Sequence, residues 1–95
     1  MTYELEFHPD AWAEWNRLDN SVRTALKKKL AKRLESPHVP ASLLHGDLAN
    51  CYKLKNDSTG HRLVYEVIEE RVIVYVLAVG ERARLDAYRD ARGRR

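Results

Sequence analysis

Near the start of the chain, the spacing of apolar residues changes from a period of two to a period close to four. Residues 3–7 alternate apolar and charged side chains, which is typical of a half-buried strand. Pro9 suits the first turn of a helix, and alanine, tryptophan and leucine then recur at helical spacing. The pattern therefore predicts a short helix over residues 9–18, with Trp12 and Trp15 on its packing face.

A second helix is predicted to run to about Glu35, where Ser36 and Pro37 stop it. Its apolar positions recur every four residues: Val22, Leu26, Leu30 and Leu34. The lysines and arginines of this helix are predicted to lie on its outer face. Residues 37–49 contain prolines and a glycine and show no period, which predicts a loop leading into a sheet.

The second half of the chain has the pattern of strands separated by turns. The strand-like runs are residues 50–55, 61–68 and 71–79. A turn-forming Asn-Asp-Ser-Thr-Gly segment and a tight Glu-Glu connection separate them, which indicates an antiparallel meander. The third run is apolar on both faces, so we expect a central strand with the two helices on one side and a final helix, over about 83–91, near the other.

Residues 1–95 are expected to form a small single domain of the α+β class, because 44% of the residues are hydrophobic and can build one core. The predicted order is an N-terminal strand, a two-helix hairpin, a three-stranded antiparallel meander completing a four-stranded sheet, and a short C-terminal helix. The single cysteine, Cys51, cannot form an internal disulfide, and no cysteine or histidine spacing fits zinc. No metal site and no cofactor are therefore expected.

A cytoplasmic location is expected from the distribution of apolar residues. The longest uninterrupted apolar run, residues 72–79, is far shorter than the ~20 residues that cross a bilayer. Glu4 and Glu6 are incompatible with a secretory leader.

The net charge of +3 is only mildly basic, but the positive charges are grouped. One group lies on the predicted second helix: Lys27, Lys28, Lys29, Lys32 and Arg33. Another group of arginines begins at Arg82. Such a run is most often a solvated face, but two of them on either side of a third basic cluster favour nucleic acid as a partner.

The third basic cluster is predicted at one edge of the meander, where Lys55, Arg62 and Arg82 converge. Lys53 and Lys55 are two residues apart and therefore share a face of their strand. If Lys55 pairs with Arg62 across the turn, the side chains of Lys53, Lys55 and Arg62 lie on one face of the sheet. If Lys55 pairs with His61 instead, Arg62 lies on the opposite face. The sequence leaves both registers open.

Cations gathered on a rigid sheet, without a carboxylate pair or metal site beside them, are suited to binding phosphate. The alternative is that they are ordinary charges on an exposed sheet edge. Proton transfer by such a cluster is unusual, because lysine and arginine have reference pKa values of ~10.4 and above ~12. Like charges placed close together favour the neutral form of a lysine, which improves it as a base.

Several stretches of the chain are characteristic when taken together: residues 26–30, 34–37, 51–55, 60–65 and 79–82. With them the chain resembles, over nearly its whole length, the RelE family of toxins from bacterial toxin–antitoxin systems. The Gly-x-Arg-Leu-Val-Tyr motif at 60–65 is shared across the RelE/ParE superfamily, and the paired lysines with Arg82 and Tyr88 are more specific. The resemblance implies a ribosome-dependent endoribonuclease that cleaves mRNA in the ribosomal A site by attack of a ribose 2′-hydroxyl, and so inhibits translation.

The resemblance also implies roles for individual residues. Lys53 and Lys55 match the active-site lysines, and Arg62 matches the arginine that steadies the scissile phosphate. Arg82 matches the proton donor, and Tyr88 matches the aromatic residue that holds the bent nucleotide. The residues expected to bind ribosomal RNA are Lys27, Lys28, Lys32, Arg33 and His45.

Two positions depart from the family pattern and reduce the local positive charge. His45 stands where close relatives often carry arginine, and Glu81 stands where they often carry lysine. The partners that the resemblance implies are a cognate RelB-like antitoxin, the 70S ribosome with its 16S RNA, and mRNA, with operator DNA bound only through the antitoxin complex. Neither a membrane nor a small-molecule substrate is expected.

Two other functions are compatible with this sequence. The protein could be a toxin of the same fold that inhibits DNA gyrase, as the ParE branch does, although the complete set of Lys53, Lys55, Arg62, Arg82 and Tyr88 argues against it. It could also be a non-catalytic RNA-binding or regulatory module, which the departures at His45 and Glu81 favour slightly. Cleavage of mRNA on purified ribosomes distinguishes these functions.

Overall fold

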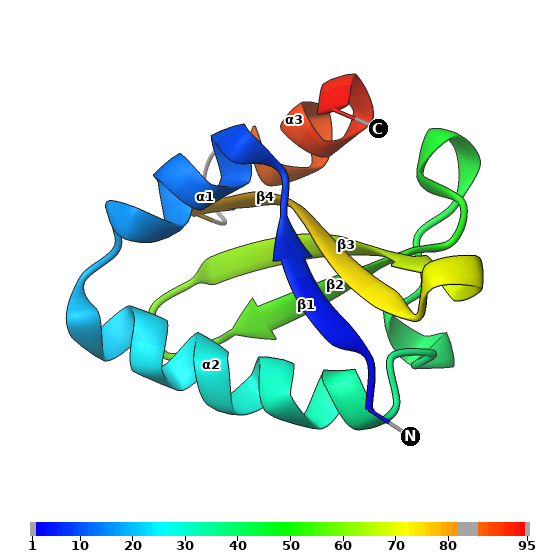
Figure 1. The fold of residues 1–95 in the computed structure, drawn as a ribbon. Helices are drawn as coiled ribbons and strands as arrows, with labels where there is room; N and C mark the ends of the chain where they lie inside the picture. Colours follow the sequence, from blue (N-terminus) through cyan, green and yellow to red (C-terminus); the bar gives the residue numbers. More distant parts are fainter. Residues whose placement is uncertain (1, 82–85, 95) are drawn as a thin grey trace.

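The computed structural model describes residues 2–81 and 86–94 of the chain. Its strands are β1 (Glu4–Phe7), β2 (Cys51–Asn56), β3 (His61–Ile68) and β4 (Ile73–Glu81). Its α-helices are α1 (Pro9–Asn16), α2 (Asn20–Glu35) and α3 (Asp86–Arg94), and short 3-10 turns cover Pro40–Ser42, Gly46–Leu48 and Glu69–Arg71. This order confirms the predicted α+β fold (Figure 1).

The strands form one sheet in the order β1-β4-β3-β2. β2, β3 and β4 are antiparallel neighbours, which confirms the meander, and β1 adds to β4 in parallel. β4 is therefore central, and β2 and β1 are the edge strands. α1 and α2 carry the chain from β1, at one edge of the sheet, toward β2 at the opposite edge.

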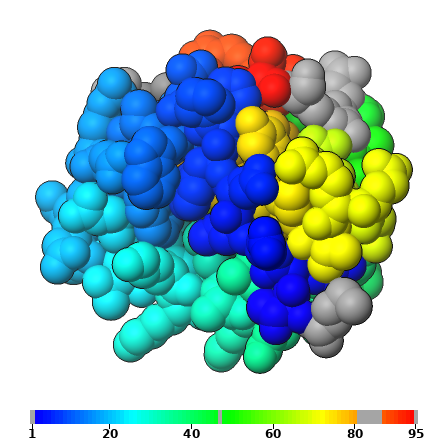
Figure 2. All heavy atoms as spheres, viewed as in Figure 1, coloured from blue at the N-terminus to red at the C-terminus, as the bar shows by residue number. Residues whose placement is uncertain are grey.

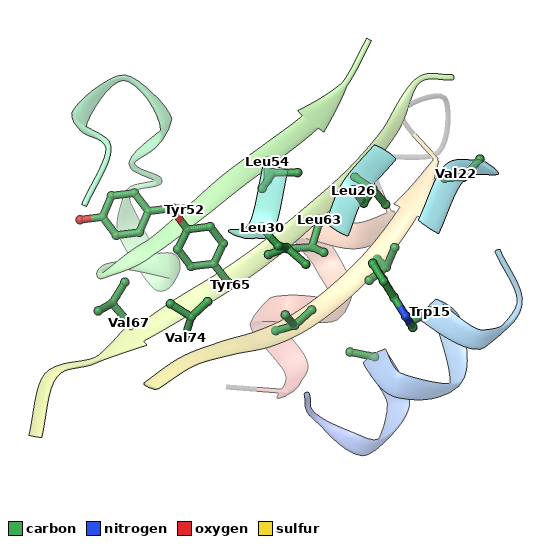
Figure 3. Close-up of a cluster of buried hydrophobic side chains, with 13 residues drawn as sticks. Trp15, Val22, Leu26, Leu30, Tyr52, Leu54, Leu63, Tyr65, Val67 and Val74 are labelled. Carbon is green, nitrogen blue, oxygen red and sulfur yellow. The ribbon is translucent and has the colours of Figure 1, made fainter. Parts of the chain in front are cut away.

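One face of the sheet is covered by α1 and α2, whose apolar stripes pack on it. Ala11 and Trp15 of α1 are buried against the sheet, and so is the stripe of α2 predicted from its spacing, except that its last member, Leu34, is only partly buried. Figure 3 shows these side chains meeting those of β2, β3 and β4, with Tyr52 and Tyr65 at one end and Trp15 at the other. Viewed from the side of β1, the surface is formed mainly by α1, α2, β1 and the connection between β3 and β4 (Figure 2).

The other face of the sheet is covered by α3 and by the loop before β2. Ala87 and Ala91 of α3 pack on Val64, Leu77 and Ala78. β4 has a bulge here, since Val64 pairs with Ala78 while the next residue of β3 pairs with Val76. The extra residue, Leu77, is fully buried on the α3 side. β4 is apolar on both faces because residues of both faces pack into buried clusters.

Some element boundaries differ from the predicted ones. The first helix ends at Asn16 rather than 18, and the last helix runs to Arg94 rather than 91. The beginning predicted for that last helix, at residue 83, lies outside the described residues. Trp12 is 51% exposed rather than packed, because Ala11 and Trp15 take the inward face of α1 and leave Trp12 at its border, 5.2 Å from the ring of Phe7.

None of the helices in the described part of the chain is both long enough and apolar enough to span a membrane. Cys51 is fully buried, as expected for a small core residue.

Candidate active site

The pairing of β2 with β3 decides between the two registers that the sequence left open. Lys55 pairs directly with Arg62, and Lys53 pairs with Val64. Residues that face one another in an antiparallel pair project from the same face of the sheet. The side chains of Lys53, Lys55 and Arg62 therefore share one face, as required by the first of the two predicted arrangements.

The turn between β2 and β3 fixes this register. The carbonyl oxygen of Asn56 accepts hydrogen bonds from the backbone N–H of Gly60 at 2.8 Å and of Thr59 at 3.3 Å. Gly60 has a φ of 78°, in the left-handed region that glycine adopts without steric cost. Asn56 is buried, and its Oδ1 accepts from the hydroxyl of Ser58 at 3.0 Å. The turn thus closes on Asn56 and sets Lys55 opposite Arg62.

The face that carries these cations is the one on which α3 lies. Val64, the partner of Lys53, belongs to the apolar cluster beneath α3. Tyr88 of α3 is half-buried and packs against the same cluster. Arg62 pairs with Gly80 near the end of β4, where the backbone of Ala87 comes within 3.5 Å of the position a Cβ of Gly80 would occupy. The structure therefore brings Lys53, Lys55, Arg62 and Tyr88 to one side of the sheet.

Arg82, the remaining residue of the predicted catalytic set, lies outside the described residues. The described chain ends its central strand at Glu81, directly before Arg82, and resumes at Asp86, the first residue of α3. The placement of Arg82 therefore remains a prediction from the sequence.

The cations on this face are accessible to solvent. Lys55 is exposed, and Lys53 and Arg62 are partly exposed. Among the residues that the structure describes, no group of histidine, cysteine or carboxylate side chains is arranged to hold a metal ion. The side chains that β2 and β3 place on this face are cationic, and anionic phosphate is a ligand that suits them.

The loop before β2 borders the same face. His45 is exposed, one residue before the short turn Gly46–Leu48. Leu44 and Leu48, on either side of it, pack into the cluster beneath α3. His45 is therefore on the same side of the sheet as the lysines.

The outer face of α2 carries Lys27, Lys28 and Lys32, which are all exposed as predicted. The expectation that Arg33 lies on this outer face is wrong. Its guanidinium group turns inward and donates to the hydroxyl of Tyr65 at 2.9 Å and to the carbonyl oxygen of Lys53 at 3.2 Å. The three lysines therefore lie on the solvent-exposed side of the helix, whereas the side chain of Arg33 points toward the sheet.

The inward turn of Arg33 has a physical cause in the buried hydroxyl of Tyr65. Tyr65 is fully buried, and its hydroxyl donates to the carbonyl oxygen of Pro37 at 2.8 Å. Its oxygen can still accept a hydrogen bond, which Arg33 supplies while its guanidinium lies 5.8 Å from the centre of the Tyr65 ring. Burial raises the pKa of the Tyr65 phenol above its ordinary value, although Arg33 opposes the shift.

The polar contacts of Lys29 and Arg33 with β2 were missed by the sequence analysis. Their spacing of four residues places both on one stripe of α2, but a run of basic residues gives no sign of which members turn toward the sheet. The ion pair between Glu14 and Arg94 was missed for a similar reason, because its partners are separated by almost the whole chain.

Comparison with known proteins identifies the class to which this fold and site belong. Residues 5–86 match the family described as the ParE toxin of type II toxin-antitoxin system, parDE. The chain is 48% identical over 91 residues to the mRNA interferase toxin RelE of Escherichia coli strain K12, covering 96% of this chain and 95% of that protein. The chain therefore belongs to the RelE family of toxins, within the RelE/ParE superfamily of type II toxin–antitoxin systems.

Solved structures agree with this assignment. The fold is similar to a mutant of the Escherichia coli toxin RelE in the free state, with a TM-score of 0.90 and 46% identity over 99% of this chain and 98% of that chain. It is also similar to a chain of the intact Escherichia coli RelBE toxin–antitoxin complex, with a TM-score of 0.80 and 49% identity over 83% of this chain and 95% of that one.

Proposed function

We propose that this protein is the toxin of a bacterial toxin–antitoxin system and acts as an mRNA interferase, an endoribonuclease that cleaves mRNA in the A site of the ribosome. The observation that carries the proposal is the pairing of Lys55 with Arg62, which places Lys53, Lys55 and Arg62 on one accessible face. Similarity over nearly the whole chain to a protein named as an mRNA interferase supports the same activity.

The proposed reaction is an in-line attack of a ribose 2′-oxygen on the adjacent phosphorus. The bond from phosphorus to the 5′-oxygen breaks, which leaves a 2′,3′-cyclic phosphate on one fragment and a 5′-hydroxyl on the other. The 2′-hydroxyl loses its proton to a base, and the departing 5′-oxygen gains one from an acid. Negative charge accumulates on the phosphate in the transition state and must be stabilised.

The residues on the cationic face are assigned to these tasks by their chemistry and position. Lys53 or Lys55 accepts the proton, and the other lysine stabilises the phosphate charge. Arg62, directly opposite Lys55, steadies the scissile phosphate. Tyr88 stacks on the bent nucleotide from the α3 side, and Arg82 protonates or stabilises the departing oxygen.

Dependence on the ribosome would follow from the proton-transfer chemistry of lysine and arginine. Lysine and arginine are weak proton-transfer groups near neutrality, so catalysis relies on positioning the message and on charge. The ribosome can hold the mRNA in the bent geometry that in-line attack requires. The entropic cost of ordering the message is then met by binding to the ribosome rather than by the small protein alone.

The exposed lysines of α2 provide a second contact with RNA in this proposal. Lys27, Lys28 and Lys32 would bind phosphates of 16S ribosomal RNA in the 70S ribosome, and His45 would contact RNA beside the cationic face. Arg33 is withdrawn from this set, because its guanidinium is engaged within the protein.

The proposed partner in the cell is a RelB-like antitoxin, in line with the solved RelBE complex of the similar Escherichia coli toxin. An acidic, partly disordered antitoxin segment would wrap the basic surface and fold on binding. Its natural target is α3, which carries Tyr88 and is held by small apolar residues. Operator DNA would be bound through the toxin–antitoxin complex, and both proteins would act in the bacterial cytoplasm.

A second candidate is inhibition of DNA gyrase, because the matched family description is that of ParE toxins. The experiment that separates the two functions is induction of the protein in cells, followed by mapping of mRNA 5′ ends and a supercoiling assay with purified gyrase. New 5′ ends within translated codons, with unchanged supercoiling, support the interferase. Intact messages with inhibited supercoiling support the ParE-like function, and neither effect supports a non-catalytic RNA-binding module.

A further inference from the structure

β2 carries two lysines of the proposed active site, and it is an edge strand whose outward carbonyl groups need partners. The carbonyl oxygen of Cys51 accepts from the backbone N–H of Leu44 at 2.9 Å. The next two outward carbonyls have no strand beside them. Side chains of α2 supply their partners instead.

Lys29 and Arg33 provide these hydrogen bonds. The ammonium group of Lys29 donates to the carbonyl oxygen of Lys55 at 2.6 Å, and Arg33 donates to that of Lys53 at 3.2 Å. The two donors are four residues apart, on one stripe of a helix whose Leu26 and Leu30 are locked in the core. Each of the two donors therefore meets the backbone of one of the two active-site lysines.

Arg33 is held in place by contacts beyond β2. Its guanidinium also donates to the buried hydroxyl of Tyr65 at 2.9 Å and to Oγ of Ser42 at 3.3 Å. The planar arginine fork thus joins α2, β3, the loop after Pro40 and the backbone of Lys53. A group fixed on several sides can in turn fix the strand that it contacts.

We propose that Lys29 and Arg33 are positioning residues for catalysis, and that they hold β2 so that the side chains of Lys53 and Lys55 are aimed at the scissile phosphate. The inference rests on the proposed interferase function. The carbonyl and the side chain of a residue are attached to the same backbone segment, so a strand that twists at the carbonyl also moves the distant lysine amine. A displacement of about 1 Å at a reacting group can cost about 100-fold in rate.

The test replaces the donors by methionine, which keeps an unbranched stem and good helix propensity but cannot donate. The variants are Lys29→Met, Arg33→Met and the double variant. Arg71→Met is the matched control, because Arg71 is exposed on the turn between β3 and β4 and contacts only Glu6 among the described ion pairs. Arg33→Lys keeps a positive charge and a single donor nitrogen at this position but lacks the planar guanidinium group of arginine.

Two measurements are made on every variant. Hydrogen exchange of the isolated protein should be about tenfold faster across Cys51–Asn56 in the double variant, with the amides of β4 and α1 unchanged. Single-turnover cleavage at saturating ribosomes should be about tenfold slower in each single variant and about 100-fold slower in the double variant, with unchanged ribosome affinity. Arg33→Lys should recover part of the rate, and Arg71→Met should match the wild type.

Several results overturn the inference. Unchanged exchange in β2 would show that Lys29 and Arg33 do not hold this strand in place. Equally faster exchange throughout the protein would show that Arg33 contributes to overall stability rather than to the position of β2. Weaker ribosome binding with a normal rate at saturation makes the pair an RNA contact. If the wild type fails to cleave mRNA on ribosomes, the proposed function is wrong, while the exchange measurement still decides whether Lys29 and Arg33 hold β2.

Discussion

Arg94 and Glu14 form a two-pronged ion pair that joins α3 to α1 around the edge of the sheet. The two contacts are 2.8 Å from Nη1 of Arg94 to Oε1 of Glu14 and 2.9 Å from Nη2 to Oε2. The side chains are only 15% and 18% exposed, so the pair is largely shielded from water.

The same pair completes the hydrogen bonding of β4. β1 accompanies β4 only as far as the pairing of Phe7 with Val76, so beyond Val76 the backbone groups of β4 that face away from β3 have no neighbouring strand. Arg94 donates to the carbonyl oxygen of Leu77 at 3.0 Å, and the N–H of Val79 donates to Oε1 of Glu14 at 3.0 Å. Each charged group therefore has both an ionic partner and a backbone partner.

The first prediction is that this ion pair anchors α3 on the sheet. The buried apolar residues described on α3 are Ala87 and Ala91, which offer little area, so removal of the pair should release the helix. Arg94→Met should make exchange at residues 86–94 much faster and lower the free energy of unfolding by about 2 kcal/mol, the scale of a shielded charged hydrogen bond. Arg92→Met, an exposed change on the same helix, should do neither. Equal protection of α3 in both variants would contradict the prediction.

The second prediction concerns acid. Burial alone would raise the pKa of Glu14, but the hydrogen bonds from Arg94 and from the N–H of Val79 lower it below its ordinary value. A carboxylate with a depressed pKa in the folded state stabilises that state above the pKa of the unfolded chain, near ~4.3, and loses its contribution as the pH falls through the folded value.

The pH dependence is tested by measuring the free energy of unfolding in urea for the wild type and Glu14→Gln between neutral pH and pH ~3. The wild type should be more stable at neutral pH, and the difference should shrink steadily below the unfolded pKa of ~4.3. A difference that stays constant through this range would show that Glu14 contributes through packing rather than through its charge.

The third prediction concerns the exposed lysines of α2. Lys28→Glu combined with Lys32→Glu should weaken binding to empty ribosomes and make the remaining binding less dependent on salt. Each lost phosphate contact should remove about one unit from the slope of log affinity against log salt. Unchanged affinity and slope, measured by sedimentation at several salt concentrations, would return this helix face to ordinary solvated surface.

The repeating patterns of the sequence predicted the fold well because they reflect burial directly. The run 61–68 is a strand with those bounds, and the four-residue stripe of α2 faces the core. Trp12 was placed incorrectly because a helical spacing does not show where the buried sector of a short helix ends. Residue propensities and the spacing of apolar positions therefore predicted the helices and strands, but not every side chain that faces the core.

The candidate site required information that the sequence does not contain. Whether Lys55 faces Arg62 depends on how the turn closes on Asn56, and neighbouring registers differ by a single residue. Arg33 turns inward because Tyr65 and the edge of β2 offer acceptors, which become neighbours of α2 only in the folded chain. Local patterns can place a cation on a helix but cannot choose between solvent and a distant carbonyl.

The most direct test of the proposed activity is single-turnover cleavage of an mRNA on purified ribosomes by the wild type and by Arg62→Ala. Arg62 is partly exposed and lies outside the buried core, so the variant should fold normally, as circular dichroism can verify. Arg71→Ala is the control for loss of one arginine at a distant surface. We expect cleavage by the wild type and the control, with a 2′,3′-cyclic phosphate at the new 3′ end, and a rate at least ~100-fold lower for Arg62→Ala. Cleavage by Arg62→Ala at the wild-type rate would contradict the assignment of the chemistry to this face of the sheet.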